Sequence, residues 1–268
     1  MDEVDFDAGL CQSRLDTRWL GRRLVARREL ESTNDAAWDL LAAGAPKGTV
    51  IVADVQTRGR GRAGRTWHQA PGRGLALSVL MSAGERVPLS LVPLLAGLGL
   101  AEGLESLSLT AELKWPNDLL IAGRKVAGVL CESRSGPGPG RAVVIGAGVN
   151  VGEGPGDFSP EIAGSATSLR IEGHDLGREE VAAAILNRLE RLWTLAEEQG
   201  GAPVLDGWRR RATCWGRRVA VATPSGRLAG VAEDLDAEGR LVLRLDAGDR
   251  AALVAGDLEL DSGMRIER

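Results

Sequence analysis

The segment AELKWPNDLLIAGRKVAGVLCESRSGPGPGRAVVIGAGVNV, residues 111–151, contains three runs with the composition of β-strands. They are AELKWPNDLLI, GRKVAGVLCES and RAVVIGAGVNV, and the SGPGPG between the last two is typical of a hairpin or loop. Upstream, GTVIVADV (48–55) and LALSVLMS (75–82) predict two more buried strands. The 19 polar residues between them, Gln56 to Gly74, are too many for an ordinary connection, so we expect a functional loop.

Helical patterns flank these strands. Ser32-Thr33-Asn34-Asp35 followed by AAWDLLAAG predicts an N-cap and a short helix that ends at Gly44. Apolar spacing predicts longer helices over 88–107, packed on the sheet, and over 177–200, with a short helix over 203–211. Residues 1 to about 20 show no period and predict a loosely held lead-in before a first strand-like run at 22–28.

The last part of the chain has a different pattern. From Arg217, short β-rich runs alternate with turn clusters such as TPSG and DAEG, which predicts a small antiparallel barrel. We place the boundary near residues 211–214, giving domains 1–211 and 212–268. Residues 232–261 hold nine acidic and three basic residues, so this module is not expected to bind polyanions.

The composition excludes several classes of protein. With 44% hydrophobic and 26% charged residues, it is that of a globular protein. The longest uncharged apolar run, 91–101, is about half of the ~20 residues that a membrane helix needs. The acidic N-terminus is the reverse of a targeting segment, and three scattered cysteines predict reduced thiols, so we expect a cytoplasmic protein with no membrane partner. Two distant histidines predict no zinc site.

Lysine is rare in this chain. Of its 33 basic residues thirty are arginine, and the lysines are Lys47, Lys114 and Lys125. A lone lysine is more often solvated than catalytic, but its retention among so many arginines indicates a need for a compact ammonium. Lys114 and Lys125 lie in KWPND and GRKVAG, whereas Lys47 lies in a turn and is predicted to have no functional role.

The loop QTRGRGRAGRTW, residues 56–67, holds four arginines and no acid. Its glycines let the backbone approach a ligand, and its guanidiniums can donate to phosphate or carboxylate oxygens, so we predict an anion-binding loop. Three alternatives are weaker. The G-x-G-x-x-G spacing of Gly59, Gly61 and Gly64 lacks the helix that a dinucleotide fold requires. An RNA-binding Arg-Gly segment would be a single copy between core strands, and a solvated turn would leave four charges without counter-charge.

Four ordered motifs together resemble biotin protein ligases, also called biotin–[acetyl-CoA-carboxylase] ligases, from about residue 22 to the end. They are Ser-Thr-Asn (32–34), Gln56 with GRGRAGRTW (59–67), KWPNDLLI…GRKVAG (114–128) and GAGVN (146–150). The resemblance implies an α+β catalytic domain with a mixed sheet flanked by helices, related to class II aminoacyl-tRNA synthetases, and a small C-terminal SH3-like β-barrel. Some bacterial members carry an N-terminal DNA-binding domain. This chain has no room for one before its first strand, so we expect a short form with no DNA partner.

The resemblance also implies a reaction. The biotin carboxylate attacks the α-phosphate of ATP to form biotinyl-5′-AMP, and a lysine of a biotin carboxyl carrier domain then takes the biotin and releases AMP. Biotin and ATP are the expected substrates, with Mg²⁺ held mainly by the ATP phosphates. A lipoate–protein ligase of the same fold, a biotin sensor without turnover and an RNA-binding protein are the alternatives. A monomer and a homodimer are both compatible with the sequence.

Residue roles follow from the positions that match the family's motifs. The predicted catalytic residues are Lys125, Arg62, Lys114 and Asp118. The predicted biotin-binding residues are Ser32, Thr33, Asn34, Gln56, Gly59, Arg60, Gly61, Arg62, Lys125 and Gly128. The predicted ATP-binding residues are Arg62, Arg65, Trp67, Lys114, Asn117 and Asn150, and no metal-ligating residue is predicted. Since carboxylate and phosphate repel each other, the cations among these residues would lower the barrier by neutralising both.

Overall fold

The computed structural model describes residues 4–84, 86–135, 141–223 and 226–260. The helices are α1 (Ala8–Ser13), α2 (Thr33–Ala42), α3 (Val92–Ser106), α4 (Arg178–Gln199) and α5 (Ala202–Arg211). The strands are β1 (Leu24–Leu30), β2 (Val50–Gln56), β3 (Leu75–Ala83), β4 (Glu112–Lys114), β5 (Asp118–Ile121), β6 (Arg124–Ser135), β7 (Arg141–Val149), β8 (Arg218–Thr223), β9 (Gly226–Leu235), β10 (Leu241–Leu245), β11 (Arg250–Leu253) and β12 (Asp257–Leu260). Residues 136–140 of the SGPGPG loop and 224–225 of the TPSG turn lie outside the described residues.

Seven strands form the larger sheet, in the order β1-β2-β3-β7-β6-β5-β4. Only the β1–β2 pair is parallel, so the sheet is mixed, as predicted. The predicted strand AELKWPNDLLI is wrong as one element, because it forms β4 and β5. These two strands pair antiparallel, with Lys114 opposite Asp118. Pro116 lies in the turn between them, where its missing N–H costs no sheet hydrogen bond.

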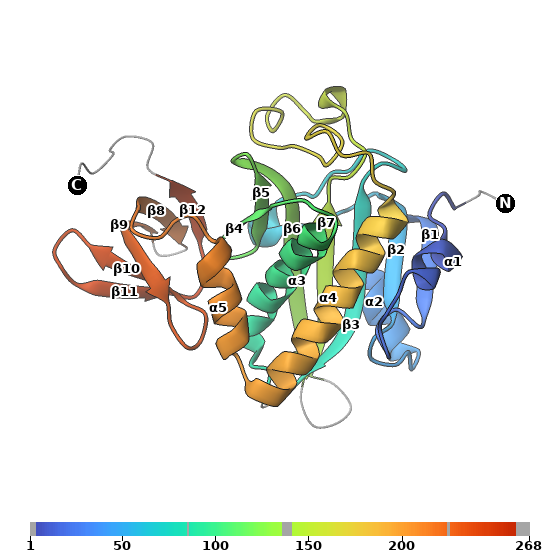
Figure 1. The fold of residues 1–268 in the computed structure, drawn as a ribbon, viewed down its shortest axis with the longest axis horizontal. Coiled ribbons are helices and arrows are strands. Elements are labelled where there is room, and N and C mark those ends of the chain that lie inside the picture. The colour runs from blue at the N-terminus through green and yellow to red at the C-terminus, as the bar shows by residue number, and fades with distance from the viewer. Residues whose placement is uncertain (1–3, 85, 136–140, 224–225, 261–268) are drawn as a thin grey trace.

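Alternating side chains of the central strands pack on opposite faces of the sheet. Val50 and Val52 belong to the large core under α3 and α4, which lie side by side across one face (Figure 1). Ile51 points the other way and packs with Leu80 and with Trp38 of α2. The sheet is therefore covered by two long helices on one face and by the short α2 on part of the other.

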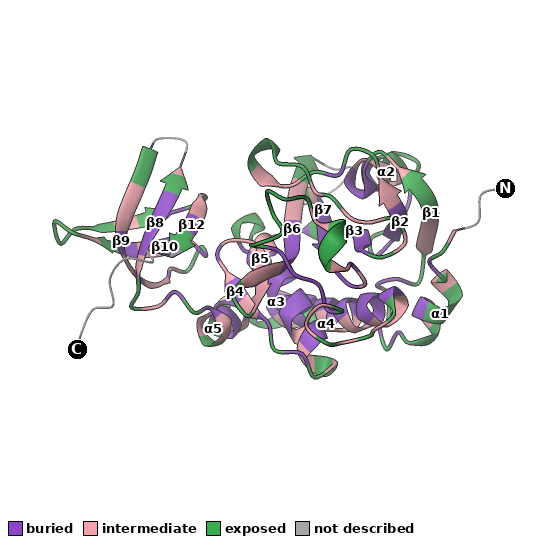
Figure 2. Ribbon diagram, turned by 90° about the horizontal axis from the view of Figure 1, so that it is seen from above, coloured by how far each residue is buried: buried purple, intermediate pink, exposed green. Residues whose placement is uncertain are grey.

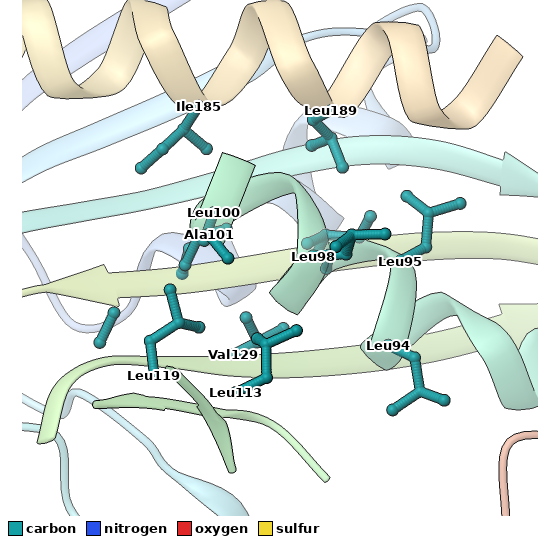
Figure 3. Close-up of a cluster of buried hydrophobic side chains, with 14 of the residues drawn as sticks. Leu94, Leu95, Leu98, Leu100, Ala101, Leu113, Leu119, Val129, Ile185 and Leu189 are labelled. Atoms are coloured by element: carbon teal, nitrogen blue, oxygen red, sulfur yellow. The ribbon is translucent and has the colours of Figure 1, made fainter. Parts of the chain in front are cut away.

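Helix α3 is apolar on all sides because other elements surround it. Gly99 and Gly103 let α4 approach closely: a Cβ on Gly103 would lie 2.8 Å from the Cα of Ile185. Figure 3 shows Ile185 and Leu189 of α4 facing the leucines of α3. Among the described residues, 89–106 is the one helical segment long and apolar enough to span a membrane, but 67% of it is buried inside the protein. Its hydrophobicity matches that of a core helix.

Residues 4–20 are packed, so the predicted loose lead-in is wrong for this part of the chain. Phe6, Cys11 and Leu20 are buried, and α1 contacts α4, near which it lies in Figure 2. The Glu190 carboxylate of α4 accepts hydrogen bonds from the backbone N–H groups of Arg18, Trp19 and Leu20 at 2.6, 3.0 and 2.8 Å. These partners are about 170 residues apart, and such a contact leaves no local period in the sequence.

The smaller sheet has the order β11-β10-β9-β8-β12 and is antiparallel throughout, as predicted. It lies beyond α5, at the opposite end of the molecule from α1 (Figure 1). It contacts the larger unit through Gly239, whose carbonyl accepts a hydrogen bond from Trp115 Nε1 at 3.3 Å. A Cβ on Gly239 would meet Leu94 of α3 at 2.6 Å, so the two units pack closely here.

We predict that Glu190→Ala lowers the free energy of unfolding by about 3 kcal/mol, because three backbone N–H groups lose their acceptor. Urea unfolding followed by circular dichroism measures this change. Glu198→Ala, an exposed carboxylate on the same helix, is the control and should unfold at the wild-type midpoint. A wild-type midpoint for Glu190→Ala as well would contradict the role of Glu190.

Candidate functional site

A hollow on the α2 face of the sheet holds the candidate site. Gly128 of β6 lies opposite Gly148 of β7, and Ser78 of β3 lies opposite Gly146. These small residues share the face of Ile51 and Leu80, but α2 ends before it covers them. The space that missing side chains leave is an inner cavity of about 110 Å³.

Close contacts show that the glycines are required for this arrangement. A Cβ on Gly146 would lie 2.2 Å from Asn34 Oδ1, and a Cβ on Gly148 would lie 2.2 Å from Cε2 of the Trp67 ring. Neither contact is tolerable, since even tight van der Waals contacts exceed 3 Å. The N-terminus of α2 and the Trp67 ring therefore rest directly on the sheet backbone.

Most of the predicted site residues line the inner cavity. They are Ser32, Thr33, Asn34, Gln56, Arg60, Gly61, Arg62, Arg65, Trp67, Asn117, Asp118, Lys125 and Gly128. Gly59 lines an adjacent outer cavity of about 640 Å³ that reaches Gly239 and Val254 of the smaller unit. The two cavities share Arg62 and Asn117, so the arginine-rich loop divides them.

A polar network holds the first turn of α2 at the cavity. Gln56 Oε1 accepts from the Thr33 backbone N–H at 2.9 Å, and the Thr33 hydroxyl lies 3.1 Å from the same oxygen. Ser32 occupies the N-cap position as predicted, but its side chain makes no capping hydrogen bond and stays at the cavity. Ser78, which the sequence prediction missed, lies 2.7 Å from Asn34 Oδ1 and 2.8 Å from the Thr33 hydroxyl. The sequence feature that could have identified Ser78 is its hydroxyl group inside the apolar run LALSVLMS.

The arginine-rich loop folds back on itself as a small hairpin. Arg60 and Thr66 form an antiparallel bridge, and Gly61 N–H donates to the Arg65 carbonyl at 2.7 Å. At the tip, Ala63 and Gly64 have φ angles of 53° and 74°, in the left-handed region that glycine tolerates and alanine does not favour. The loop is therefore an ordered cover over the inner cavity.

Carboxylates far away in the sequence compensate three of the four arginines of this loop. Arg58 pairs with Glu31, and Arg65 pairs with Asp257 of β12. Arg60 pairs with Asp35 and Glu132, and its hydrogen bond to Asp35 is the largest factor that raises the pKa of the guanidinium. The counter-charge that the sequence analysis required for these arginines is therefore supplied, for three of the four, by carboxylates of the same chain.

Arg62 has a different environment. Its Nη1 donates to the neutral Asn117 Oδ1 at 3.1 Å, and among the described residues it forms no ion pair with a carboxylate. Burial lowers the pKa of the Arg62 guanidinium, while the charge of Asp118 opposes this shift and that of Arg65 adds to it. A half-buried cation beside a neutral amide at the wall between two cavities is well placed to bind an anion.

Lys125 and Asp118 form an ion pair inside the cavity. Lys125 Nζ lies 2.6 Å from Asp118 Oδ1 and 5.7 Å from the centroid of the Trp67 ring. Backbone hydrogen bonds hold the residue: Lys125 N–H donates to Ser165 and its carbonyl accepts from Thr167 N–H, at 2.7 and 2.8 Å. A Cβ on Gly128 would lie 3.1 Å from the Lys125 ammonium, so this glycine makes room for it.

Two predicted ATP-binding residues lie outside both cavities. Lys114 is half-buried at the end of β4 and lines neither of them. Asn150 is 4% exposed, and its Nδ2 donates to the Thr167 carbonyl at 2.8 Å, with the Lys125 carbonyl at 3.5 Å. The sequence predicts that Asn150 binds ATP; in this structure its amide holds the backbone of the Lys125 segment.

The chain is similar to known ligases over nearly its whole length. Residues 25–150 match the model of the Biotin/lipoate A/B protein ligase family, and residues 215–261 match the Biotin protein ligase C terminal domain. The Bifunctional ligase/repressor BirA of Bacillus subtilis is 35% identical over 251 residues, covering 92% of this chain and 76% of that protein. The Biotin--[acetyl-CoA-carboxylase] ligase of Mycobacterium tuberculosis is 36% identical over 253 residues, covering 88% of each chain.

A solved structure of a biotin protein ligase has the same fold as this chain. The biotin protein ligase from Aquifex aeolicus, in complex with biotin and ATP, superposes with a TM-score of 0.76 at 29% identity, covering 90% of this chain and 99% of that one. The shared fold and the family match over residues 25–150 place the chain in the class of biotin/lipoate protein ligases. Within that class, the chain belongs to the biotin protein ligase family.

We predict that Gly148→Ala displaces Trp67 and opens the loop. The added methyl overpacks the site by about 1–3 kcal/mol, which makes the open loop about tenfold more populated. Limited trypsin digestion measures this as faster cleavage at the loop arginines. Gly164→Ala is the matched control, because its Cβ would meet nothing within 4 Å. Equal cleavage rates for the two variants would disprove the packing of Trp67 on Gly148.

Proposed function

We propose that this chain is an ATP-dependent biotin protein ligase that forms biotinyl-5′-AMP and transfers biotin to a lysine of a biotin carboxyl carrier domain. The observation that carries the proposal is the inner cavity, which brings Lys125, Arg62, Gln56 and the 32–34 segment together under one loop. The relatives named as biotin–[acetyl-CoA-carboxylase] ligases support the choice of carrier. Biotin and MgATP are the substrates.

Biotin binding is assigned to the deep end of the cavity. Biotin has an apolar body and a neutral ureido ring, which needs a few fixed donors and acceptors. Ser32, Thr33, Asn34 and Gln56 offer both, and their network with Ser78 fixes their positions before the ligand arrives. Such preorganisation reduces the entropy that binding costs.

Adenylation requires two anions to meet. A biotin carboxylate oxygen attacks the α-phosphorus of ATP, and the bond to pyrophosphate breaks. Lys125 and Arg62 are the cations that neutralise the carboxylate and the α-phosphate, with Arg65 toward the other phosphates. Asp118 holds the Lys125 ammonium in place at 2.6 Å, and the loop excludes water from the mixed anhydride.

In the transfer step, the carrier's lysine amine attacks the acyl carbon and AMP leaves. Asp118 is the carboxylate in the cavity that can orient this amine. Trp67 is assigned to pack against the adenine side, and Asn117 to the nucleotide through its contact with Arg62. Lys114 and Asn150 act on ATP only indirectly in this scheme, through the strand ends that carry them.

The finer architecture is part of the same proposal. We assign residues 1–211 to a catalytic domain of class II aminoacyl-tRNA synthetase type and residues 212–268 to an SH3-like barrel; the end of α5 at Arg211 and the antiparallel second sheet support this division. Mg²⁺ would enter with ATP, because the described residues contain no group of three His, Cys, Asp or Glu side chains that could hold it. The free cysteines Cys11, Cys131 and Cys214 support a reducing, cytoplasmic environment.

The lipoate alternative is not favoured. The C-terminal match is to the biotin protein ligase domain, and the relatives described above are named as biotin ligases or as BirA. The Bacillus subtilis relative is named a ligase and a repressor, and for this chain we propose the ligase activity.

The function is tested by biotin-dependent exchange of pyrophosphate into ATP and by labelling of a purified biotin carboxyl carrier domain. We expect exchange with biotin, no comparable exchange with lipoate, and streptavidin-reactive carrier after incubation with MgATP. Exchange with lipoate alone would reassign the enzyme, whereas RNA binding without adenylate formation would support the alternative built on the arginine-rich loop. Biotin binding without pyrophosphate exchange would support the alternative of a biotin sensor without turnover.

We predict that Lys125→Arg slows adenylation at least about 100-fold, equivalent to ~3 kcal/mol in the barrier, although the positive charge is kept. The physical reason is the narrow space beside Gly128 and Asp118, which fits an ammonium. The rate is measured as pyrophosphate exchange. Lys47→Arg, the same substitution at a surface lysine paired with Glu197, is the control and should retain wild-type exchange. Near-normal exchange by Lys125→Arg would remove the special role of Lys125.

A further inference from the structure

Buried polar atoms without partners are concentrated in one region. Among the described residues, the side-chain atoms that are buried without a hydrogen-bond partner are Trp67 Nε1, Gln69 Oε1 and both carboxyl oxygens of Glu153. Trp67 is the last residue of the arginine-rich loop, Gln69 follows it, and Glu153 lies in the segment after β7. None of the roles proposed above uses Gln69 or Glu153.

Residues 69–74, which we call the return arm, connect Trp67 to β3. Gln69 Nε2 donates to the carbonyls of Ala53 and Asp54 at 3.3 and 3.1 Å, and Gly72 N–H donates to the Asp54 carbonyl at 3.3 Å. Because Nε2 is used by two backbone acceptors, the orientation of the amide is fixed and Gln69 Oε1 is left as an acceptor without a donor.

Glu153 lies against the same arm. It is 1% exposed, and its Oε1 lies 2.4 Å from the position that a Cβ on Gly74 would take. The Gln69 Cβ lies 2.8 Å from that same position. Gly74 therefore lets the Glu153 carboxyl and the Gln69 side chain approach the same point. An ionised carboxylate there would add a charge to a buried region that already holds the orphaned acceptor Gln69 Oε1, which is costly without water.

The charges around Glu153 do not compensate it. Arg178 of α4 is paired with Asp54 at 2.7 Å, and Arg73 of the return arm is paired with Asp157. Burial raises the pKa of Glu153 from 4.5 to about 7; the charge of Asp157 adds to this shift, whereas the amides of Glu153 and Val151 and the charge of Arg178 oppose it. The nearby cations are thus engaged by other carboxylates.

We propose that Glu153 is a positioning residue whose carboxyl is protonated and donates its proton to Gln69 Oε1, clasping the return arm to the segment after β7. The single proton satisfies two of the orphaned groups at once. The clasp fixes the end of the loop two residues beyond Trp67, and so fixes how the indole lies on Gly148. Above neutral pH the proton leaves, the donor is lost and the arm loosens. Only the ligand readout below rests on the proposed function.

The test compares the wild type with Glu153→Gln, whose amide keeps a donor at every pH. A folded-state pKa above the unfolded value means that stability is complete below about pH 4.5 and is lost as the pH rises through about 7. Between pH 5.5 and 8, the unfolding equilibrium constant of the wild type should therefore rise about 30-fold more than that of the variant. Thermal and urea unfolding without ligand measure this difference. Calorimetry should show biotin affinity falling several-fold from pH 6 to 8 in the wild type and staying level in the variant.

Glu198→Gln is the matched control, because it makes the same substitution at an exposed carboxylate of α4 and leaves the clasp intact; it should keep the wild-type pH profiles. Parallel stability profiles for the wild type and Glu153→Gln would overturn the proposal. So would stabilisation of the wild type alone by K⁺ or Mg²⁺ at pH 8, which would indicate that the carboxylate holds a cation. If biotin fails to bind at any pH while the stability profiles diverge, the proposed function fails and the protonated clasp stands.

Discussion

The site depends on one constraint: three positions on the α2 face of the sheet are glycines and carry no side chain. Gly128, Gly146 and Gly148 occupy adjacent positions of β6 and β7, where any larger residue would fill the hollow. Asn34 and Trp67 use this space from two sides, at distances that leave no room for a Cβ. The first turn of α2, the return of the loop and the inner cavity are consequences of the same flat patch of backbone.

Electrostatic pairing across the fold then selects which cations can act on a ligand. Arg60 forms ion pairs with α2 and β6, and Arg65 forms one with β12, so both hold the loop in place before any ligand binds. Among the described residues, Arg62 donates a hydrogen bond to the Asn117 amide oxygen and forms no ion pair, and Lys125 is paired with Asp118. Before any ligand binds, a loop that looks uniformly cationic in the sequence is therefore divided into arginines that are paired with carboxylates and Arg62, which is not paired among the described residues.

Local patterns predicted much of this structure. The strands, the α2 start at Thr33, the long helices and the antiparallel C-terminal sheet follow from periodicity and turn residues, which depend on neighbours in sequence. The packed N-terminus, the carboxylate partners of the loop and the buried Asn150 were not predictable in this way, because each depends on a contact between distant segments. The motifs placed thirteen site residues around one cavity, but they could not show that Lys114, at the end of β4, lies outside its lining.

The scarcity of lysine has a geometric explanation at Lys125. Its ammonium is confined by Asp118 at 2.6 Å, by the Trp67 ring at 5.7 Å and by the backbone at Gly128, where a Cβ would lie 3.1 Å from the ammonium. A guanidinium is planar, wider and forked, so it could reach Asp118 only by displacing the ring or the strand. Lys47 shows the opposite case: its ammonium lies 4.5 Å from the Trp19 ring and 3.0 Å from Glu197 at the surface, where an arginine could make the same contacts. The requirement for lysine at position 125 therefore comes from the narrow space around its ammonium. This space lies where the glycines of the sheet meet the arginine-rich loop.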